Sequence, residues 1–166
     1  MGLLAFIKDA GEKLFGGQEA KAAQEAADAP TPENLARQAE ASAAAIVAHL
    51  ERHGLYNGSM QVGFDVATAE VTVSGQVGSQ ETREKVLLCC GNVAGVASVN
   101  DQLEVPARPE PVAQFHTVVS GDNLSKIARK FYGDANKYPA IFEANKPMLS
   151  HPDKIYPGQV LRIPAP

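Results

Sequence analysis

A proline-rich segment near residue 110 limits what this chain can fold into. Residues 105–113, VPARPEPVA, hold three prolines in nine positions. Proline fixes φ and has no backbone N–H, so this segment can neither continue a helix nor form the middle of a sheet. We therefore predict an extended linker over residues 106–113, which separates two small domains at residues 31–105 and 114–166.

The first unit begins with a helix and a hairpin. Thr31 is the expected N-cap, Pro32 takes the first helical position, and Gly54 ends the helix. One apolar face repeats at helical spacing, through Leu35, Ala39, Ala43, Ile46, Val47 and Leu50. Residues 60–66 and 69–75 each alternate apolar and polar side chains, and the two residues between them predict a tight hairpin.

A second helix and a third strand complete this unit. Ser79 is expected to cap a helix that reaches Gly91, where the glycine predicts a left-handed C-terminal cap. Residues 96–105 alternate again and predict a strand. The order predicts an α+β domain with helices on one face of a three-stranded sheet.

The second unit predicts the order βααβ. Residues 115–119 predict a strand, Asp122 is expected to cap the next helix, and Gly133 closes it. A second short helix starts at Pro139, and residues 156–164 predict the returning strand.

The first thirty residues precede both units. Residues 3–15 mix apolar and charged side chains in a pattern that predicts a short amphipathic helix, or two turns broken near Gly11, docked on the domain that follows. Residues 16–30 are rich in Ala, Gln and Glu and hold no large apolar residue. They predict a linker or an exposed helical spacer.

Composition and the N-terminus argue against several partners. A net charge of -4 and a pI near 5.5 do not fit a nucleic-acid-binding protein, which needs a clustered basic face. Lys8 and Asp9 interrupt the first apolar run too early for a secretory signal, and no stretch approaches the roughly 18 apolar residues of a membrane-spanning helix. We expect a cytoplasmic monomer without membrane insertion.

Side chains suited to catalysis are sparse. Cys89 and Cys90 are adjacent, so a disulfide between them would strain the backbone, and we expect them to pack within a helix. His49 and His53 lie one helical turn apart but lack the glutamate of a zinc-protease motif, which favours a solvated helix end over a metal site. We expect this protein not to be an enzyme.

Residues 114–164 resemble a LysM domain. The resemblance rests on HTVVSGDNLSKIA, FYGD, IFEANK and IYPGQVLRIP. This family binds polymers of N-acetylglucosamine, such as peptidoglycan or chitin, in a shallow groove between two loops. The resemblance implies a glycan groove at Ser120, Gly121, Asp122, Asn123, Ile155, Tyr156 and Pro157.

Residues 31–105 resemble a BON domain, through the hairpin, its VSG turn and the segment GNVAGVASV. Together with the N-terminal MGLLAFIKDAGEKL and the LysM-like unit, this order resembles the bacterial cytoplasmic potassium-binding proteins built from BON and LysM domains. The Ala-rich stretch at 16–34 looks longer here than in that family. The resemblance implies a potassium-ion sensor linked to stress response, with Rb⁺ and Cs⁺ as further candidate ions.

The segment CCGNVAGVASVND, residues 89–101, fits such an ion through its main chain. K⁺ prefers rings of backbone carbonyls, and a helix end supplies unpaired carbonyls and the negative end of its dipole. Gly91 and Gly95 are expected to adopt positive φ and turn carbonyls toward one point. With the N-terminal segment as partner, the expected ligands are the carbonyls of Ile7, Lys8, Ala10, Gly91, Val93 and Val96.

Two other interpretations of these segments stay open. GNVAGV also fits a plain helix cap followed by a turn. The chain could instead be a cell-wall module that holds glycan through its LysM-like unit, which would require export.

Overall fold

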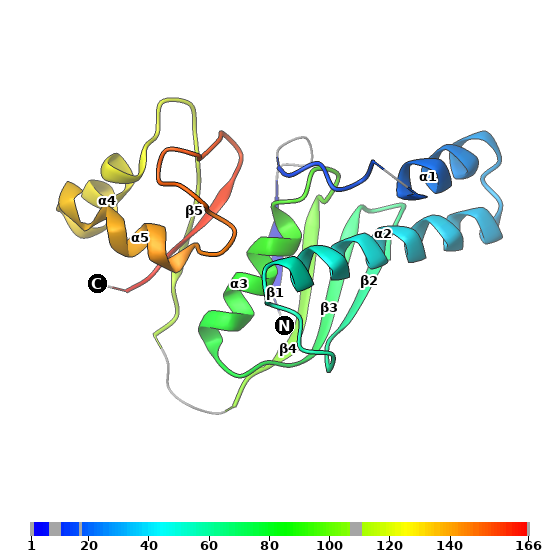
Figure 1. Ribbon diagram of the computed structural model, residues 1–166, viewed down its shortest axis with the longest axis horizontal. Coiled ribbons are helices and arrows are strands. Elements are labelled where there is room, and N and C mark those ends of the chain that lie inside the picture. Colours follow the sequence, from blue (N-terminus) through cyan, green and yellow to red (C-terminus); the bar gives the residue numbers. More distant parts are fainter. Residues whose placement is uncertain (1, 7–10, 17, 107–110, 166) are drawn as a thin grey trace.

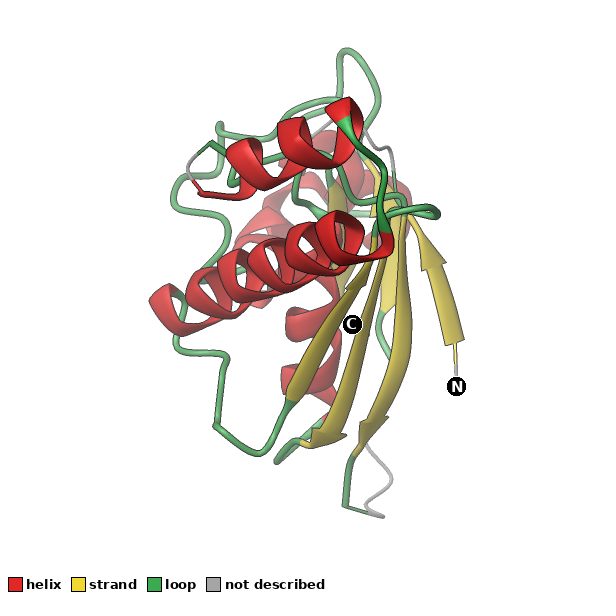
Figure 2. Cartoon of the chain, turned by 90° about the vertical axis from the view of Figure 1, so that its right-hand side faces the viewer, coloured by secondary structure: helices red, strands yellow, loops and turns green. Residues whose placement is uncertain are grey.

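The computed structural model describes residues 2–6, 11–16, 18–106 and 111–165. The first unit is a four-stranded sheet in the order β1-β4-β3-β2, with helices on one of its faces (Figures 1 and 2). Its elements are β1 (Gly2–Ala5), α1 (Gln18–Asp28), α2 (Pro32–Arg52), β2 (Gln61–Asp65), β3 (Glu70–Gln76), α3 (Gln80–Gly91) and β4 (Ser98–Glu104). The predicted α+β class is therefore confirmed.

The N-terminus adds a strand that the sequence did not predict. β1 pairs antiparallel with β4, with Leu3 opposite Asn100, so the predicted helix over residues 3–15 is wrong and the sheet has four strands. Since β4 pairs with β3 on one side only, its other edge is open to β1. Short apolar runs fit a helix and a strand equally well, and only this distant edge selects the strand.

Residues 16–30 form more than a spacer. α1 packs against α2, and Ala22 and Ala26 are buried between them. An ion pair of 3.1 Å between Arg37 and Glu25 also joins the two helices. The stretch is helical, as one of the two alternatives proposed, but one of its faces is covered.

Local signals set the ends of α2 and α3. Thr31 Oγ1 accepts a hydrogen bond from Asn34 N at 3.2 Å, and Ser79 Oγ accepts one from Thr82 N at 3.0 Å, so both predicted caps are confirmed. The β2–β3 turn spans residues 66–69, two more than predicted, because Asp65 Oδ1 accepts a hydrogen bond from Thr68 N and ends β2 early.

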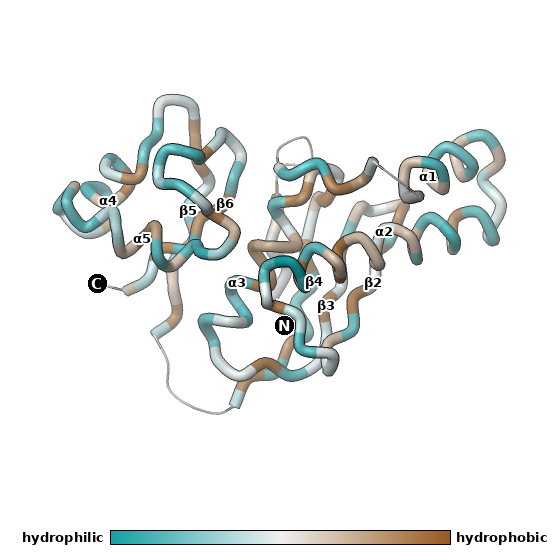
Figure 3. Tube along the Cα trace, viewed as in Figure 1, coloured by the Kyte–Doolittle hydropathy of each residue, from teal (hydrophilic) through white to brown (hydrophobic). Residues whose placement is uncertain are grey.

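The core of the first unit lies between the sheet and the helices. Ile46 and Leu50 of α2 and Val71 and Val73 of β3 are fully buried there. Along most of β3 and β4, buried residues alternate with more exposed ones, as expected of a sheet covered on one face. Both strands mix hydrophobic and hydrophilic residues (Figure 3). No helix in the described ranges is long and apolar enough to cross a membrane.

The second unit has the predicted βααβ order with one added 3₁₀ turn. Its elements are β5 (Gln114–Thr117), α4 (Leu124–Tyr132), η1 (Ala135–Lys137), α5 (Tyr138–Ala144) and β6 (Val160–Ile163). β5 and β6 pair antiparallel, and Ile127 and Ile141 anchor the core. Gly133 closes α4 at φ +73°, as predicted.

A buried ion pair joins the two units. Glu84 of α3 accepts a hydrogen bond from Arg162 Nε of β6 at 2.6 Å, and their side chains are only 2% and 9% exposed. The other oxygen of Glu84 accepts hydrogen bonds from Gln80 Nε2 and from Ala113 N. The end of the proline-rich segment is therefore fixed against α3, and the two units pack on one another.

Candidate functional site

The candidate site is built on the end of α3. The helix ends at Gly91, and its C-cap, Asn92, donates its backbone N–H to Leu88 O at 2.9 Å. No residue outside the helix, among those the structure describes, donates a hydrogen bond to the carbonyls of Cys89, Cys90 or Gly91. These carbonyls carry the negative end of the helix dipole.

Gly91 is needed for a reason other than the one predicted. Its φ is not positive, so it is not a left-handed cap. A Cβ at this position would instead collide with the ring of Phe6, which lies directly against the helix. Gly91 therefore lets the N-terminal segment approach α3 closely.

Gly95 behaves as predicted, with φ at +100°. It belongs to a turn in which Val96 N donates to Val93 O at 3.1 Å. The side chains of Val93 and Val96 are fully buried in the core, so only their main-chain groups can serve a ligand. No described residue donates a hydrogen bond to Val96 O.

The N-terminal segment is fixed on both sides of this loop. Phe6 N donates to Ala97 O at 2.9 Å. Further along, Glu12 N donates to Asn92 O at 2.8 Å and Ala94 N donates to Glu12 O at 3.0 Å. Gly11, at φ +130°, sits so close to Asn92 O that a Cβ would collide with it.

Residues 7–10 connect these two fixed points. Ile7, Lys8 and Ala10, the three predicted ligands from this segment, lie outside the described residues. The structure thus places Gly91 at the end of α3 and Val93 and Val96 in the loop that follows, and it holds Phe6 and Glu12, the flanks of the other predicted group, against this loop.

Asn92 links the loop to the second unit, a role that the sequence did not predict. Its side-chain amide donates to Val160 O at 2.9 Å, and its amide oxygen accepts from Val160 N at 2.8 Å. This pair occupies the edge of β6 that β5 leaves open. The one available signal was a polar residue between two apolar stretches directly after a helix.

The predicted glycan loops lie beside each other. Val118 N donates to Gln159 O and Gly158 N to Val118 O, each at 2.8 Å, which joins the strand end before Ser120 to the loop after Pro157. Gly121 has a φ of +87°. The predicted cap is wrong by one residue, because Asn123 Oδ1 caps α4 by accepting from Lys126 N at 2.8 Å.

Asp122 has a different duty from the predicted one. Its Oδ2 accepts from Val119 N at 3.1 Å and from His116 Nε2 at 2.9 Å. These two hydrogen bonds, that of His116 first, lower the pKa of Asp122 below its usual value. Asp122 therefore stabilises the turn that precedes α4.

Ile155, Tyr156 and Pro157 form the other predicted glycan loop, and Tyr156 faces the first unit. It borders a cavity of about 280 Å³ shared by both units, lined by Gly11, Glu12, His49, Cys89, Asn92, Met148, Ser150, Lys154, Tyr156 and Gln159. Burial, aided by the Glu12 carboxylate, raises the pKa of Tyr156 to about 12. The hydroxyl is therefore neutral at physiological pH.

The comparisons with known proteins agree with this architecture. The BON domain family matches residues 38–107, and the LysM domain family matches residues 116–164. The protein named Potassium binding protein Kbp from Escherichia coli O6:H1 is 46% identical over 164 residues, which covers 99% of each chain. The chain belongs to the Kbp family.

Other relatives of this Kbp family member match only short regions. An uncharacterized protein of Deinococcus radiodurans is 53% identical over 49 residues, 30% of this chain and 19% of that protein. Esterase Rv1288 of Mycobacterium tuberculosis is 50% identical over 48 residues, 29% of this chain and 10% of that protein. Matches of this length correspond to one small domain, so they do not transfer the activity of these relatives to this chain.

Proposed function

We propose that this protein binds K⁺ through main-chain carbonyls of Gly91, Val93 and Val96, joined by carbonyls of residues 7–10. The observation that carries the proposal is that backbone hydrogen bonds of Phe6 and Glu12 hold the N-terminal segment against both ends of the loop. The Escherichia coli relative, which matches 99% of this chain and is named a potassium binding protein, supports the same ion. Within residues 7–10, the proposed ligands are Ile7, Lys8 and Ala10.

The chemistry of the loop suits a large monovalent cation. Carbonyl oxygens can replace the hydration shell of K⁺ without the high field of carboxylates, which favours smaller or divalent ions. The terminal carbonyls of α3 contribute a partial negative charge at the same place. Rb⁺ and Cs⁺ have the same charge and larger radii, so we propose that they bind as well.

Asn92 connects the proposed ion site to the second unit. It lies between two proposed ligands, Gly91 and Val93, while its side chain pairs with Val160 of β6. An ion that orders the loop would therefore favour the packed arrangement of the two units. The response is limited by the ion's differential affinity for the packed and unpacked states.

Several further properties belong to the same proposal. The domain limits are 31–105 for BON and 114–166 for LysM, with residues 106–113 as linker and residues 1–15 docked on BON. The protein acts as a cytoplasmic, monomeric ion sensor in stress response rather than as an enzyme. In support of the last point, burial raises the pKa of Cys89 to about 12 and that of Cys90 as well, so neither thiol is a ready nucleophile.

Thermal unfolding in KCl and in NaCl at equal ionic strength tests the potassium proposal. The melting temperature should rise with KCl in a saturable way, and RbCl and CsCl should act like KCl. Equal melting temperatures in NaCl and KCl across the titration would refute the proposal.

A second candidate function is glycan binding by the LysM unit. The LysM match at residues 116–164 favours it, and Ser120 and Gly121 are exposed. Because Tyr156 borders the cavity between the units, a glycan that needs this side chain would compete with their packing. Retention on purified peptidoglycan, increased by a variant that separates the units, is the expected result; no retention of either protein would refute it.

A further inference from the structure

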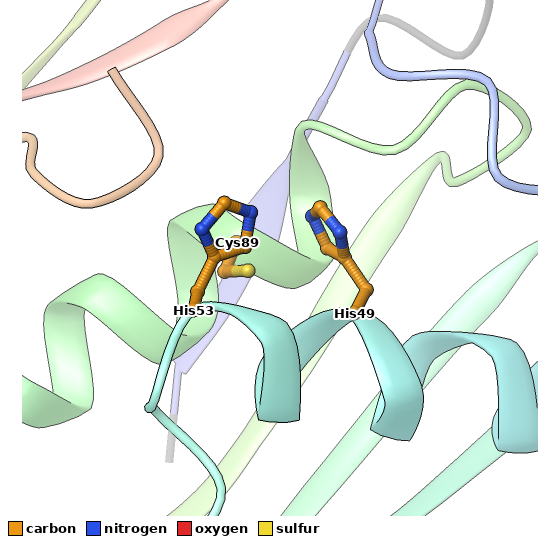
Figure 4. A group of neighbouring side chains, drawn as sticks. All are labelled: His49, His53 and Cys89. Atoms are coloured by element: carbon orange, nitrogen blue, oxygen red, sulfur yellow. The ribbon is translucent and has the colours of Figure 1, made fainter. Parts of the chain in front are cut away.

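Three side chains of types that commonly serve as transition-metal ligands lie close together between α2 and α3. His49 and His53 come from the last turns of α2 and Cys89 from α3, and one ligand atom of each lies within 4.8 Å of the others. The two imidazoles project from α2 toward α3, with the Cys89 side chain between them in this view (Figure 4). The histidine pair is therefore no solvated helix end: His49 is 3% exposed and His53 is half-buried.

The two imidazoles are in the protonation state that binds a metal, and the Cys89 thiol must lose its proton first. Burial lowers the pKa of His49 to about 4, against the pull of the Glu12 carboxylate, and burial lowers the pKa of His53 as well. Both imidazoles are therefore neutral at pH 7, the form that donates a lone pair to a metal. Cys89 is a free cysteine, and burial raises the pKa of its thiol to about 12, so a metal ion must displace the proton in order to bind.

We propose that His49, His53 and Cys89 bind a transition-metal ion of the zinc class. Zinc bonds of about 2.0–2.1 Å to nitrogen and 2.3 Å to sulfur place tetrahedral nitrogen and sulfur ligand atoms roughly 3.3–3.6 Å apart. Since the three atoms lie within 4.8 Å of one another, the cluster must contract by no more than about 1.5 Å to reach that spacing. On binding, the Cys89 thiol gives its proton to water and the thiolate forms the metal–sulfur bond.

Glu12 is placed to complete or balance the site. Its Oε2 lies 3.9 Å from His49 Nε2, and its side chain is 53% exposed. Two neutral imidazoles and one thiolate leave a divalent ion with one uncompensated charge, which this carboxylate offsets. The fourth position is taken by Glu12 or by water from the adjoining cavity, which Glu12, His49 and Cys89 all line.

The Arg52 guanidinium already occupies part of the space beside His49 and Glu12. Arg52 Nη2 lies 3.1 Å from His49 Nδ1 and 3.9 Å from Glu12 Oε1. A guanidinium has no lone pair, so it donates to Nδ1. Because its side chain is 61% exposed, Arg52 can move into solvent while the metal takes over its place beside Glu12.

This donor set differs in kind from the backbone loop. Imidazole and thiolate ligands select Zn²⁺ and similar ions over Mg²⁺ and Ca²⁺, which prefer oxygen. The loop at residues 91–97 offers only carbonyl oxygens. The two sites would bind different classes of ion near the same helix end, one through side chains and one through the main chain.

Titration of the whole protein with Co²⁺, in potassium-free buffer with a non-thiol reductant, tests the proposal. A thiolate-to-cobalt charge-transfer absorption should rise to one equivalent and be abolished by Zn²⁺ but not by Mg²⁺. Cys89→Ala should lack the band, whereas the matched variant Cys90→Ala should keep it. His53→Gln, at a half-buried position, removes one of the three ligands and should weaken Co²⁺ binding at least about tenfold.

The opposite results would overturn the metal site. These are a wild-type protein without the band, a Cys89→Ala protein that keeps it, or a His53→Gln protein that folds and binds Co²⁺ as tightly as wild type. Since potassium is absent throughout, failure here leaves the potassium proposal unaffected.

Discussion

We expect Glu84→Ala to weaken the packing of the two domains and to lower the free energy of unfolding by a measurable amount. The Arg162 Nε atom lies 2.6 Å from Glu84 Oε2, and the Arg162 side chain is 9% exposed. Removing one partner of a buried ion pair leaves the other charge uncompensated, at a cost of about 3–5 kcal/mol. Because the domains can part and let water reach Arg162, we expect the lower end, about 3 kcal/mol.

Urea unfolding followed by circular dichroism measures this cost. With a slope of about 2 kcal/mol per molar urea, a loss of about 3 kcal/mol lowers the midpoint by roughly 1.5 M. Glu81→Gln is the matched control on the same helix, because the Glu81 side chain is 53% exposed, in contrast to the buried Glu84. The control should change stability by less than about 1 kcal/mol.

The double variant Glu84→Leu/Arg162→Leu separates the ion pair from the rest of the interface. It leaves no unpaired charge, so it should be more stable than Glu84→Ala. If Glu84→Ala unfolds at the same midpoint as the Glu81→Gln control, the pair is not buried between the domains and the packing described above is incorrect.

Three further changes test the loop, its link to LysM and the turn before α4. Gly95→Val forces a β-branched residue to φ +100°, so it should reduce the rise in melting temperature on KCl addition more than Cys90→Ala does; an equal reduction in both would argue against the loop. Asn92→Ala removes both partners of the Val160 main chain and should cost about 1–3 kcal/mol in urea unfolding, whereas an unchanged midpoint would mean the pair is absent in solution. The folded-state pKa of Asp122 is lowered, so its stabilisation is present above its ordinary pKa and is lost as the pH falls through the folded pKa. The stability difference between wild type and Asp122→Asn should therefore shrink on acidification below about pH 4, and a difference independent of pH would contradict this.

Features that depend on neighbouring residues could be predicted from the sequence. The caps at Thr31 and Ser79 and the closing turn at Gly133 each follow from side chains within four positions. The βααβ order of the second unit also follows from local periodicity. Where two residues could serve one role, as Asp122 and Asn123 could for the cap of α4, the sequence could not choose between them.

Features that depend on distant contacts could not be predicted. β1 is a strand because it meets residues 98–101 of β4. Gly91 is required because Phe6 lies against it, and no local pattern predicts a contact across 85 residues. Asn92 meets Val160, 68 residues away, only when β6 packs on α3. Cys89 meets the two histidines only when α2 packs on α3.

Carbonyl ¹³C chemical shifts of the labelled protein during titration with KCl test most directly whether the ion is held by the main chain. We expect saturable shifts of the carbonyl carbons of Gly91, Val93 and Val96 with KCl and none at equal NaCl. Main-chain binding would be refuted if these three carbonyls stayed unchanged while the side-chain carboxyl carbon of Glu12 shifted, or if NaCl produced the same shifts as KCl.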